Sequence, residues 1–133
     1  MPINTDYLVI GSGIAGLRFA LDAAKTGTVA IVTKKEKTEG STNYAQGGIA
    51  SVLDPDDSFA LHIKDTLTSG DGICHEDIVK VVVQEGPQRI HELISFGVQF
   101  SQQEGGKKIF DLGREGGHSK RRIVHTKDLT GRE

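Results

Sequence analysis

The clearest hydrophobic pattern lies in the first 32 residues. The apolar run Tyr7–Ile10, with its β-branched members, is typical of a strand buried on both faces of a parallel sheet. Apolar residues then recur at the spacing of one helical face, at Leu17, Ala20, Leu21 and Ala24. This helix should end near Gly27, before a second strand at Val29–Val32. The order predicts a right-handed βαβ unit with two parallel strands.

The middle of the chain has the pattern of helices. Ser58 is a suitable N-cap for a helix that runs to about Ser69. A second helix is expected from about Glu76 to Glu85, and a third should begin at Gly86-Pro87, with the proline in its first turn. Gly97 would supply the C-cap of this third helix.

The remaining segments are mostly irregular. Between Thr38 and Val52 the chain is rich in small polar residues and glycine, which predicts a loop that approaches a neighbouring group closely. Val98–Phe100 and Ile109–Leu112 have strand-like composition and predict a short hairpin. The fold class is therefore α/β, a Rossmann-like βαβ unit with following helices and a hairpin. Two convincing strands are too few for a doubly wound sheet, so we expect part of a larger fold.

Composition narrows the class of protein. The 133 residues have the length of one domain, and 36% hydrophobic with 26% charged residues describe a soluble globular chain. No apolar run approaches the ~20 residues that cross a bilayer, and the start lacks the order of a signal peptide. We expect no membrane association and a cytoplasmic location. The single cysteine, Cys74, allows no internal disulfide.

Charge is close to balanced over the whole chain. A net charge of -2 offers no field that would drive binding to nucleic acid. The stretch from Lys107 to Arg132 nevertheless holds eight of the 16 basic residues, including Lys120-Arg121-Arg122. It is either a solvated loop or a site for a small anion, and it lacks the tyrosine or tryptophan that would stack on bases.

The motif Gly11-x-Gly13-x-x-Gly16 stands between the first predicted strand and its helix. In this context Gly11 makes the tight turn, Gly13 lets the backbone reach a pyrophosphate, and Gly16 lets helix and strand pack closely. The phosphates would lie at the N-terminus of the helix. The motif predicts binding of a dinucleotide.

The second strand ends differently from many dinucleotide-binding proteins. An acidic residue is usual there, but this chain has Thr33-Lys34-Lys35. A lysine favours either NADP, whose additional phosphate needs a cation, or FAD held by other contacts. Glu36 is close enough to remain a third option.

The glycine-rich loop decides between these dinucleotides by resemblance. The run from Gly40 to Ile49 resembles the flavin loop of the succinate dehydrogenase, fumarate reductase and L-aspartate oxidase superfamily, whose dinucleotide is FAD. With the fingerprint glycines, the resemblance implies cofactor contacts at Gly11, Ser12, Gly13, Ile14, Ala15, Gly16, Lys34, Ser41, Thr42, Asn43, Tyr44, Ala45, Gln46, Gly47 and Gly48. Glycines would admit backbone N–H groups to the flavin ring. Respiratory members carry a histidine that bonds to the flavin, and Ser41 stands in its place, so the FAD should be non-covalent.

The stretch from Arg114 to Ser119 and the ending Thr130–Glu133 are similar to L-aspartate oxidases. In that family the glutamate corresponding to Glu115 lies at the substrate site and orients the substrate's ammonium group, which succinate lacks. The alternative is a surface glutamate. His118 and His125 are either proton carriers or structural histidines. Asp65 and Asp71 are expected at the surface or in caps, and the histidines and Cys74 lack zinc-site spacing, so no metal is predicted.

The resemblance implies the amino-terminal part of an FAD-binding domain over residues 1–133. Within it we expect the βαβ unit and flavin loop over 1–52, a helical segment over 53–100, and a hairpin and substrate loop over 101–133. The family oxidises L-aspartate to iminoaspartate, passes electrons to oxygen or fumarate, and supplies quinolinate synthase in NAD biosynthesis. A fumarate reductase-like flavoprotein, an NADP-binding module and a non-catalytic fragment remain alternatives. By itself this chain should bind FAD weakly and be inactive, because its strands lack neighbours.

Overall fold

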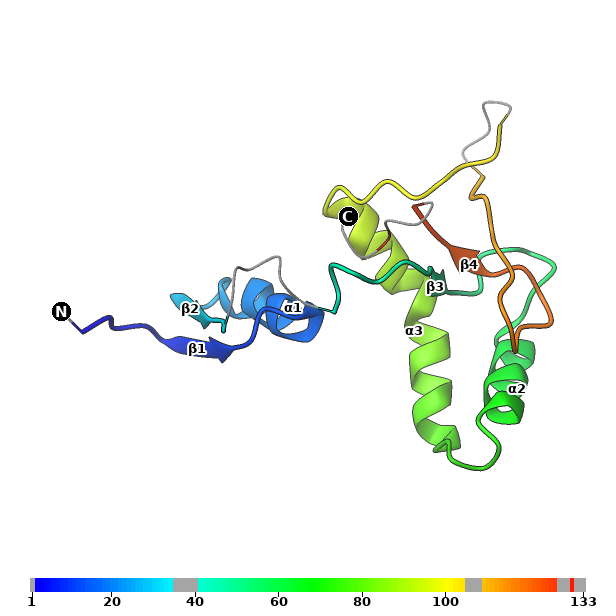
Figure 1. The fold of residues 1–133 in the computed structure, drawn as a ribbon, viewed down its shortest axis with the longest axis horizontal. Helices are drawn as coiled ribbons and strands as arrows, with labels where there is room; N and C mark the ends of the chain where they lie inside the picture. Colours follow the sequence, from blue (N-terminus) through cyan, green and yellow to red (C-terminus); the bar gives the residue numbers. More distant parts are fainter. Residues whose placement is uncertain (1, 35–40, 105–108, 127–129, 131–133) are drawn as a thin grey trace. The chain divides into compact units, whose positions relative to one another are not determined.

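The computed structural model describes residues 2–34, 41–104, 109–126 and 130. It divides into two compact units, one formed by residues up to Ala45 and the other by residues from Gln46 onward (Figure 1). Each unit is described by itself below. Within the described residues, no helix combines the length and the hydrophobicity needed to cross a bilayer.

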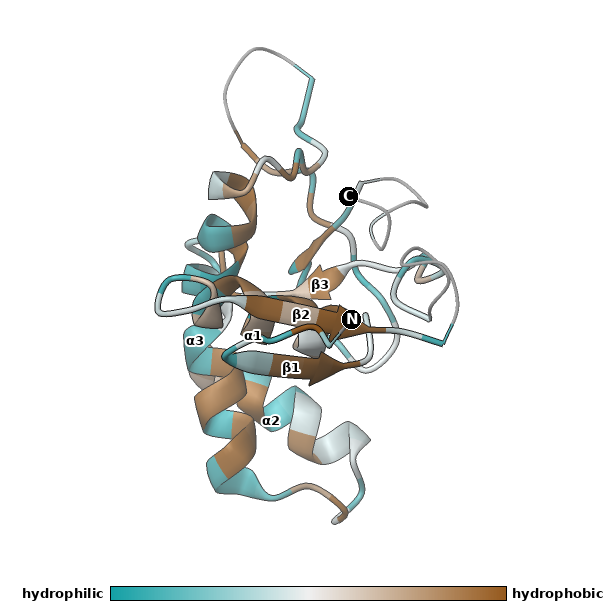
Figure 2. Ribbon diagram, turned by 90° about the vertical axis from the view of Figure 1, so that its left-hand side faces the viewer, coloured by the Kyte–Doolittle hydropathy of each residue, from teal (hydrophilic) through white to brown (hydrophobic). Residues whose placement is uncertain are grey.

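The first unit is the predicted βαβ arrangement. Strands β1 (Tyr7–Ile10) and β2 (Val29–Val32) are parallel, with Tyr7 opposite Val29 and Ile10 opposite Val32. Both strands are hydrophobic toward their carboxyl ends (Figure 2). Helix α1 (Ile14–Ala23) connects them and packs against both strands. This confirms the βαβ prediction in element order and strand direction.

The predicted apolar face of α1 is only partly buried. Ala20 and Ala23 are buried, whereas Leu17 is 41% exposed and Leu21 is 54% exposed. Ile10 is 83% exposed on β1. A parallel sheet of two strands, order β1-β2, has too little surface to cover these side chains. The exposure agrees with the expectation of a partial fold.

The second unit is built on two helices. Helix α2 (Phe59–Ser69) starts as predicted, because the Ser58 side chain accepts a hydrogen bond from the Leu61 N–H. Helix α3 (Glu76–Ser95) packs against α2. Gly97, with φ +108°, follows the last turn of α3 as a left-handed stop, close to its predicted capping position.

The prediction of two helices between Glu76 and Gly97 is wrong, because α3 is continuous and contains Pro87. Val83 and Ile90 lie seven residues apart, on the same face and on either side of the proline, and both are buried. Burial of both flanks stabilises a single helix enough to offset the N–H that the proline lacks. Tertiary packing thus overrides the local signal to stop.

Two short strands close the second unit. Strand β3 (Ile49–Ala50), within the segment predicted as a loop, pairs antiparallel with β4 (Ile123–Val124). The hairpin pairing is antiparallel as predicted, but its bridge joins Gln102 to Phe110, so it begins two residues beyond the first predicted segment, at a position expected in the turn. Its turn, residues 105–108, lies outside the described residues. The buried core of this unit comprises Ile90, Phe100, Leu112 and Val124.

Candidate functional site

The three fingerprint glycines occupy three different environments. Gly11 follows β1 with φ +108°, a left-handed conformation that favours glycine, and its N–H donates to the Val32 carbonyl at 2.8 Å. A Cβ on Gly16 would lie 2.5 Å from the Gly11 carbonyl oxygen and 3.3 Å from Val9 Cγ1. A Cβ on Gly13 would meet no described residue within 4 Å. The first glycine is therefore needed for its backbone conformation and the third for close packing, whereas the second has room for a side chain among the described residues.

The N-terminus of α1 is available to an anion. Gly13 is the N-cap residue and has no side chain to satisfy the first N–H groups, and the first turn contains no acidic residue. Ile14 and Ala15 are exposed in this turn. The N–H groups of this turn and the helix dipole suit a phosphate, so this terminus fits the pyrophosphate of a dinucleotide.

The first part of the predicted flavin loop lies beside the fingerprint within the same unit. The Ile14 N–H donates weakly to Thr42 Oγ1, 3.4 Å away, although 28 residues separate them. Ser41 to Tyr44 form a turn, and the Ala45 N–H donates to the Thr42 carbonyl. Thr42 and Asn43 are half-buried, whereas Ser41, Tyr44 and Ala45 are exposed.

The end of β2 carries the residues expected near the adenosine. Ser12 Oγ and Thr33 Oγ1 are 3.1 Å apart and link the fingerprint loop to the end of β2. Lys34 follows and is exposed. Lys35 and Glu36, the alternative contacts at this end, lie outside the described residues.

In the second unit, Gly47 and Gly48 differ in the same way as Gly13 and Gly16. A Cβ on Gly48 would collide with the Ile123 side chain and the Val124 carbonyl, so the approach of this segment to β4 requires glycine. In the part of the chain that the structure describes, a Cβ on Gly47 would have a single neighbour within 4 Å, Glu115 Oε1 at 3.7 Å. Gly48 is thus required for close packing against β4, which the sequence interpretation did not predict. Gly47 faces the Glu115 carboxylate.

A cleft of about 260 Å³ brings together two predicted parts of the site. Its walls come from the end of the predicted flavin loop, from the segment around Glu115 and from β4 with the residue after it: Gln46, Gly47, Gly48, Gly113, Arg114, Glu115, Ile123 and His125. Glu115 is exposed, so its carboxylate is accessible to a ligand in this cleft. The cleft has the dimensions of a small polar molecule and offers both a carboxylate and glycine backbone.

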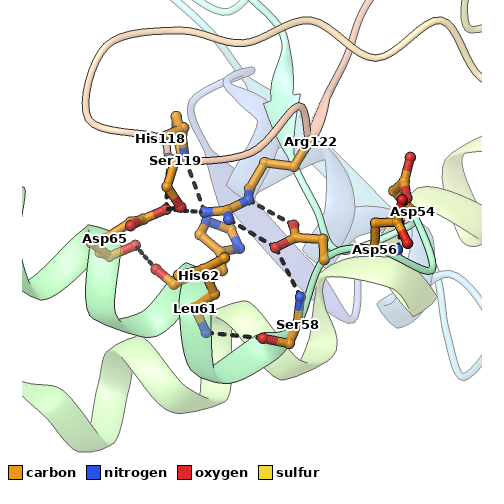
Figure 3. Close-up of polar contacts among 11 residues, drawn as sticks. Asp54, Asp56, Ser58, Leu61, His62, Asp65, His118, Ser119 and Arg122 are labelled. Carbon is orange, nitrogen blue, oxygen red and sulfur yellow. Dashed lines mark hydrogen bonds and ion pairs between the residues drawn. The ribbon is translucent and has the colours of Figure 1, made fainter.

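Arg122 does not belong to an exposed basic patch, which corrects one sequence interpretation. Its side chain is fully buried and forms a bidentate pair with Asp57, with Nε to Oδ2 and Nη2 to Oδ1 both at 2.8 Å (Figure 3). Arg122 Nη1 also donates to Asp65 Oδ2 at 2.8 Å. Neighbouring Lys120 and Arg121 are exposed, and Arg121 Nη1 donates to the Leu112 carbonyl.

Asp65 has partners that the sequence interpretation missed. Its Oδ2 accepts hydrogen bonds from the Ser119 N–H at 2.8 Å and from the Ser119 hydroxyl at 2.7 Å (Figure 3). Burial by itself would raise the pKa of Asp65, but the hydrogen bonds from Ser119 and Arg122 outweigh burial and hold this pKa below its ordinary value. Asp65 is therefore an ionised anchor for the segment that follows Glu115.

Two histidines lie next to this ion pair. His62 is buried on α2 and its ring meets the His118 ring edge-on, with centroids 5.5 Å apart. Burial first, and then the charges of Arg122 and His118, lower the pKa of His62. His118 Nδ1 lies 3.4 Å from Arg122 Nη1. His62 is thus held neutral, and His118 contacts the ion network rather than the cleft near Gly47.

His125 lies at the cleft and is partly buried. Its Nε2 is 3.8 Å from Asp111 Oδ2, and its Nδ1 is buried with no hydrogen-bond partner among the described residues. Among residues 2–34, 41–104, 109–126 and 130, no group of three or more His, Cys, Asp or Glu side chains is placed to hold a metal ion.

The ion network was not predictable from local sequence. Arg122 is separated from Asp65 by 57 positions and from Asp57 by 65 positions. The basic run Lys120-Arg121-Arg122 is recognisable in the sequence as a cluster of charge. Nothing in the sequence shows that Arg122 is buried while Lys120 and Arg121 are exposed.

Comparison with known proteins agrees with this geometry. L-aspartate oxidase 2-b, chloroplastic, of Nicotiana tabacum is 58% identical over 128 residues, which are 96% of this chain and 19% of that protein. An L-aspartate oxidase of Vibrio cholerae is 46% identical over 129 residues, 95% of this chain and 24% of that protein. A mutant form of the E. coli quinol fumarate reductase FrdA matches with a TM-score of 0.88 at 30% identity, covering 97% of this chain and 22% of that chain.

These matches share one feature, that this chain spans about a fifth to a quarter of each protein. The family model described as FAD binding domain matches residues 6–133, nearly the whole chain. The fingerprint predicts a dinucleotide, and the family indicates that this cofactor is FAD. On this evidence, the chain belongs to the FAD binding domain family.

Proposed function

We propose that this chain is the amino-terminal part of an FAD-dependent L-aspartate oxidase, which oxidises L-aspartate to iminoaspartate with oxygen or fumarate as electron acceptor. The observation that carries this proposal is the position of Glu115, exposed in a cleft and 3.7 Å from a Cβ placed on Gly47. The names and identities of the tobacco and Vibrio relatives support it.

The residues proposed to hold FAD fit the group in each unit taken separately. In the first unit, Gly11 to Gly16 and the N–H groups of the first turn of α1 would hold the pyrophosphate, with Lys34 and Ser41 to Ala45 as further contacts. In the second unit, Gln46 to Gly48 would present backbone N–H groups and the Gln46 amide to the isoalloxazine ring. Bound FAD supplies the acceptor for a hydride from the substrate's α-carbon.

Glu115 has a defined role in this proposal. Its carboxylate attracts the ammonium group of L-aspartate and disfavours a dicarboxylate without an amino group, because two like charges would then lie close together. The residue binds and orients the substrate and moves no proton. Its charge therefore selects between aminated and unaminated substrates of the same length.

The alternative is a flavoprotein of the fumarate reductase or succinate dehydrogenase type. The structural match to FrdA at 30% identity supports this alternative, but a shared fold does not by itself establish a shared function. The two functions differ at Glu115, since succinate and fumarate carry no ammonium group to pair with it. An NADP-binding module would use Lys34 but has no role for the cleft at Gly47.

The test uses the full-length flavoprotein under anaerobic conditions. Bleaching of the flavin absorbance is followed with L-aspartate and with succinate, for wild type, Glu115→Gln and Glu104→Gln. Glu104 is a matched control because it is an exposed glutamate of the same unit that lines a different hollow. We expect L-aspartate to bleach wild type and Glu104→Gln, and Glu115→Gln to raise KM for L-aspartate about 10- to 100-fold, the loss of one charged hydrogen bond. Equal bleaching by succinate, unaffected by Glu115→Gln, would contradict the proposal.

We further propose that the FAD is non-covalent, because Ser41 stands where flavinylated relatives carry histidine. Acid precipitation of the full-length protein should then release the flavin into the supernatant. We also propose that the iminoaspartate feeds quinolinate synthase in NAD biosynthesis and that the protein is cytoplasmic. Formation of quinolinate in an assay coupled to that enzyme, and cell fractionation, test these two points.

A further inference from the structure

The segment from Gly113 to Ser119, here called the Glu115 loop, is anchored at both ends. At its start, the Gly113 N–H donates to the Ile123 carbonyl at 2.9 Å and the Ile123 N–H donates back to Gly113 at 3.1 Å. At its end, both the N–H and the hydroxyl of Ser119 donate to Asp65 Oδ2. The loop is thus tied to β4 on one side and to α2 on the other.

The loop also contacts α2 between its ends. Gly117 has φ +81°, and a Cβ placed on it would lie 2.5 Å from Ser69 Oγ, on the last residue of α2. The His118 N–H donates to the Glu115 carbonyl at 3.3 Å, which closes a turn over these residues. The direction of the Glu115 side chain therefore depends on how closely the loop lies against α2.

Asp65 is itself held in place by a buried cation. Arg122 Nη1 donates to the same Oδ2 that accepts from Ser119 (Figure 3), and Nε and Nη2 of the guanidinium donate to Asp57. The Arg122 and Asp57 side chains are 0% and 1% exposed. Because the guanidinium is planar and its donors point in fixed directions, its two carboxylate partners are held in fixed positions.

A buried ion network of this kind contributes less to net stability than its distances suggest. Desolvation of the charges offsets much of their attraction, and apolar side chains of similar volume often stabilise a core equally well. Apolar packing, however, does not fix the orientation of the groups in contact. A carboxylate that receives three donors at one oxygen aligns the groups that donate to it.

We propose that Asp65 and Ser119 are positioning residues, which hold the Glu115 loop against α2 and so direct the Glu115 carboxylate toward Gly47. The inference rests on the proposed function in one respect, since Glu115 must be the group that receives the substrate's ammonium. Neither Asp65 nor Ser119 lines the cleft at Gly47. Both act through the loop.

The experiment compares substitutions in the full-length flavoprotein. Ser119→Ala removes one of the three donors to Asp65, Ser119→Thr keeps the hydroxyl, and Asp65→Asn removes the charge while keeping the shape. Ser58→Ala is the matched control, because it deletes the cap of the same helix and leaves Asp65 and the Glu115 loop untouched. The Ser58 N–H, which donates to Asp57, is retained in this control.

Steady-state kinetics give the first measurement. We expect Ser119→Ala to raise KM for L-aspartate about 3- to 10-fold with kcat within about 2-fold of wild type, since a loosened Glu115 weakens ground-state and transition-state binding alike. Asp65→Asn should raise KM further, and Ser119→Thr should restore the wild-type value. The preference for L-aspartate over succinate should fall in parallel. Unchanged KM in both Ser119→Ala and Asp65→Asn, or an equal rise in Ser58→Ala, would overturn the proposal.

Hydrogen exchange gives a second measurement that needs no substrate. In Asp65→Asn the amides of Gly116 to Ser119 should exchange faster than in wild type, while Ser58→Ala should leave them unchanged. Equal exchange in Asp65→Asn and wild type would refute the positioning role. If wild-type flavin is not bleached by L-aspartate, the proposed function fails, and the exchange measurement still decides whether Asp65 holds the loop.

Discussion

Arg122 and Asp57 face each other in a bidentate pair, with both nitrogen–oxygen distances at 2.8 Å and both side chains buried. The same guanidinium also reaches Asp65, so one buried cation is shared by two carboxylates. The pair joins the segment before α2 to the segment before β4, which are distant in sequence. Its removal should therefore affect the stability of the second unit as a whole.

Arg122→Ala should lower the free energy of unfolding by about 3–5 kcal/mol, because it leaves the buried Asp57 carboxylate and the partly buried Asp65 carboxylate without a cation. Urea-induced unfolding of the full-length protein measures this. Arg121→Ala is the control, since Arg121 is exposed and loses one hydrogen bond to a carbonyl, which costs about 0.5–1.5 kcal/mol. Equal losses in the two variants would show that the carboxylates find other partners.

Gly13→Ala and Gly16→Ala should separate cofactor binding from packing. Gly16→Ala places a Cβ 2.5 Å from the Gly11 carbonyl oxygen, so both stability and FAD affinity should fall. Gly13→Ala fits sterically, because the backbone there is extended with φ -71° and no described residue lies within 4 Å of the added Cβ. If the pyrophosphate approaches Gly13, this variant should keep its melting temperature and lose at least about 10-fold in FAD affinity. Titration of the apoprotein by flavin fluorescence measures the affinity, and unchanged affinity in Gly13→Ala would contradict the assignment.

The stability of the second unit should fall in mildly acidic solution because of His62. Its pKa in the folded protein lies below the ordinary value of 6.5, chiefly through burial and then through Arg122 and His118, against the opposing charges of Asp57 and Asp65. Below about pH 6.5 the unfolded chain therefore binds a proton that the folded chain resists. The contribution of His62 is complete above that pH and declines as the pH falls toward the folded pKa.

Urea unfolding at pH 7.5 and at pH 5.5 tests this for wild type and His62→Leu, which cannot titrate. Wild type should lose more stability between the two pH values than the variant does. Asp65 contributes in a separate window, because its pKa is lowered and its stabilising charge is lost only as the pH falls below its ordinary value of 3.8. An identical pH dependence of wild type and His62→Leu would refute the role of His62.

Ser51→Ala should stabilise the protein by about 1 kcal/mol. Ser51 is fully buried, and its Oγ has no hydrogen-bond partner among the described residues. Removing an unpartnered hydroxyl from a buried position removes a desolvation penalty, and its backbone N–H still donates to the Arg122 carbonyl. Thermal unfolding of Ser51→Ala is compared with that of Ser58→Ala, which loses a helix cap and should be destabilised by a similar amount. The melting temperature should therefore rise in Ser51→Ala and fall in Ser58→Ala. A fall in stability for Ser51→Ala would contradict the prediction.

The sequence by itself determined the elements whose cause is local. The βαβ unit follows from two short apolar runs around a helical spacing, and the start of α2 follows from Ser58 as an N-cap. The fingerprint glycines could also be interpreted from the sequence, because the strand, the turn and the helix around them are contiguous in the chain. The resemblance of the loop around Gly47 and of the segment at Glu115 added the candidate cofactor and substrate.

Only the tertiary structure decided which distant residues meet. It made α3 one helix through Pro87, because Val83 and Ile90 are buried on the same face on both sides of the proline. It paired Ile49–Ala50 with Ile123–Val124, and it buried Arg122 between Asp57 and Asp65. Local spacing records the neighbours of a residue along one helix or strand, whereas a buried ion pair across 65 positions depends on how separate elements pack. That packing is what places Glu115 beside Gly47.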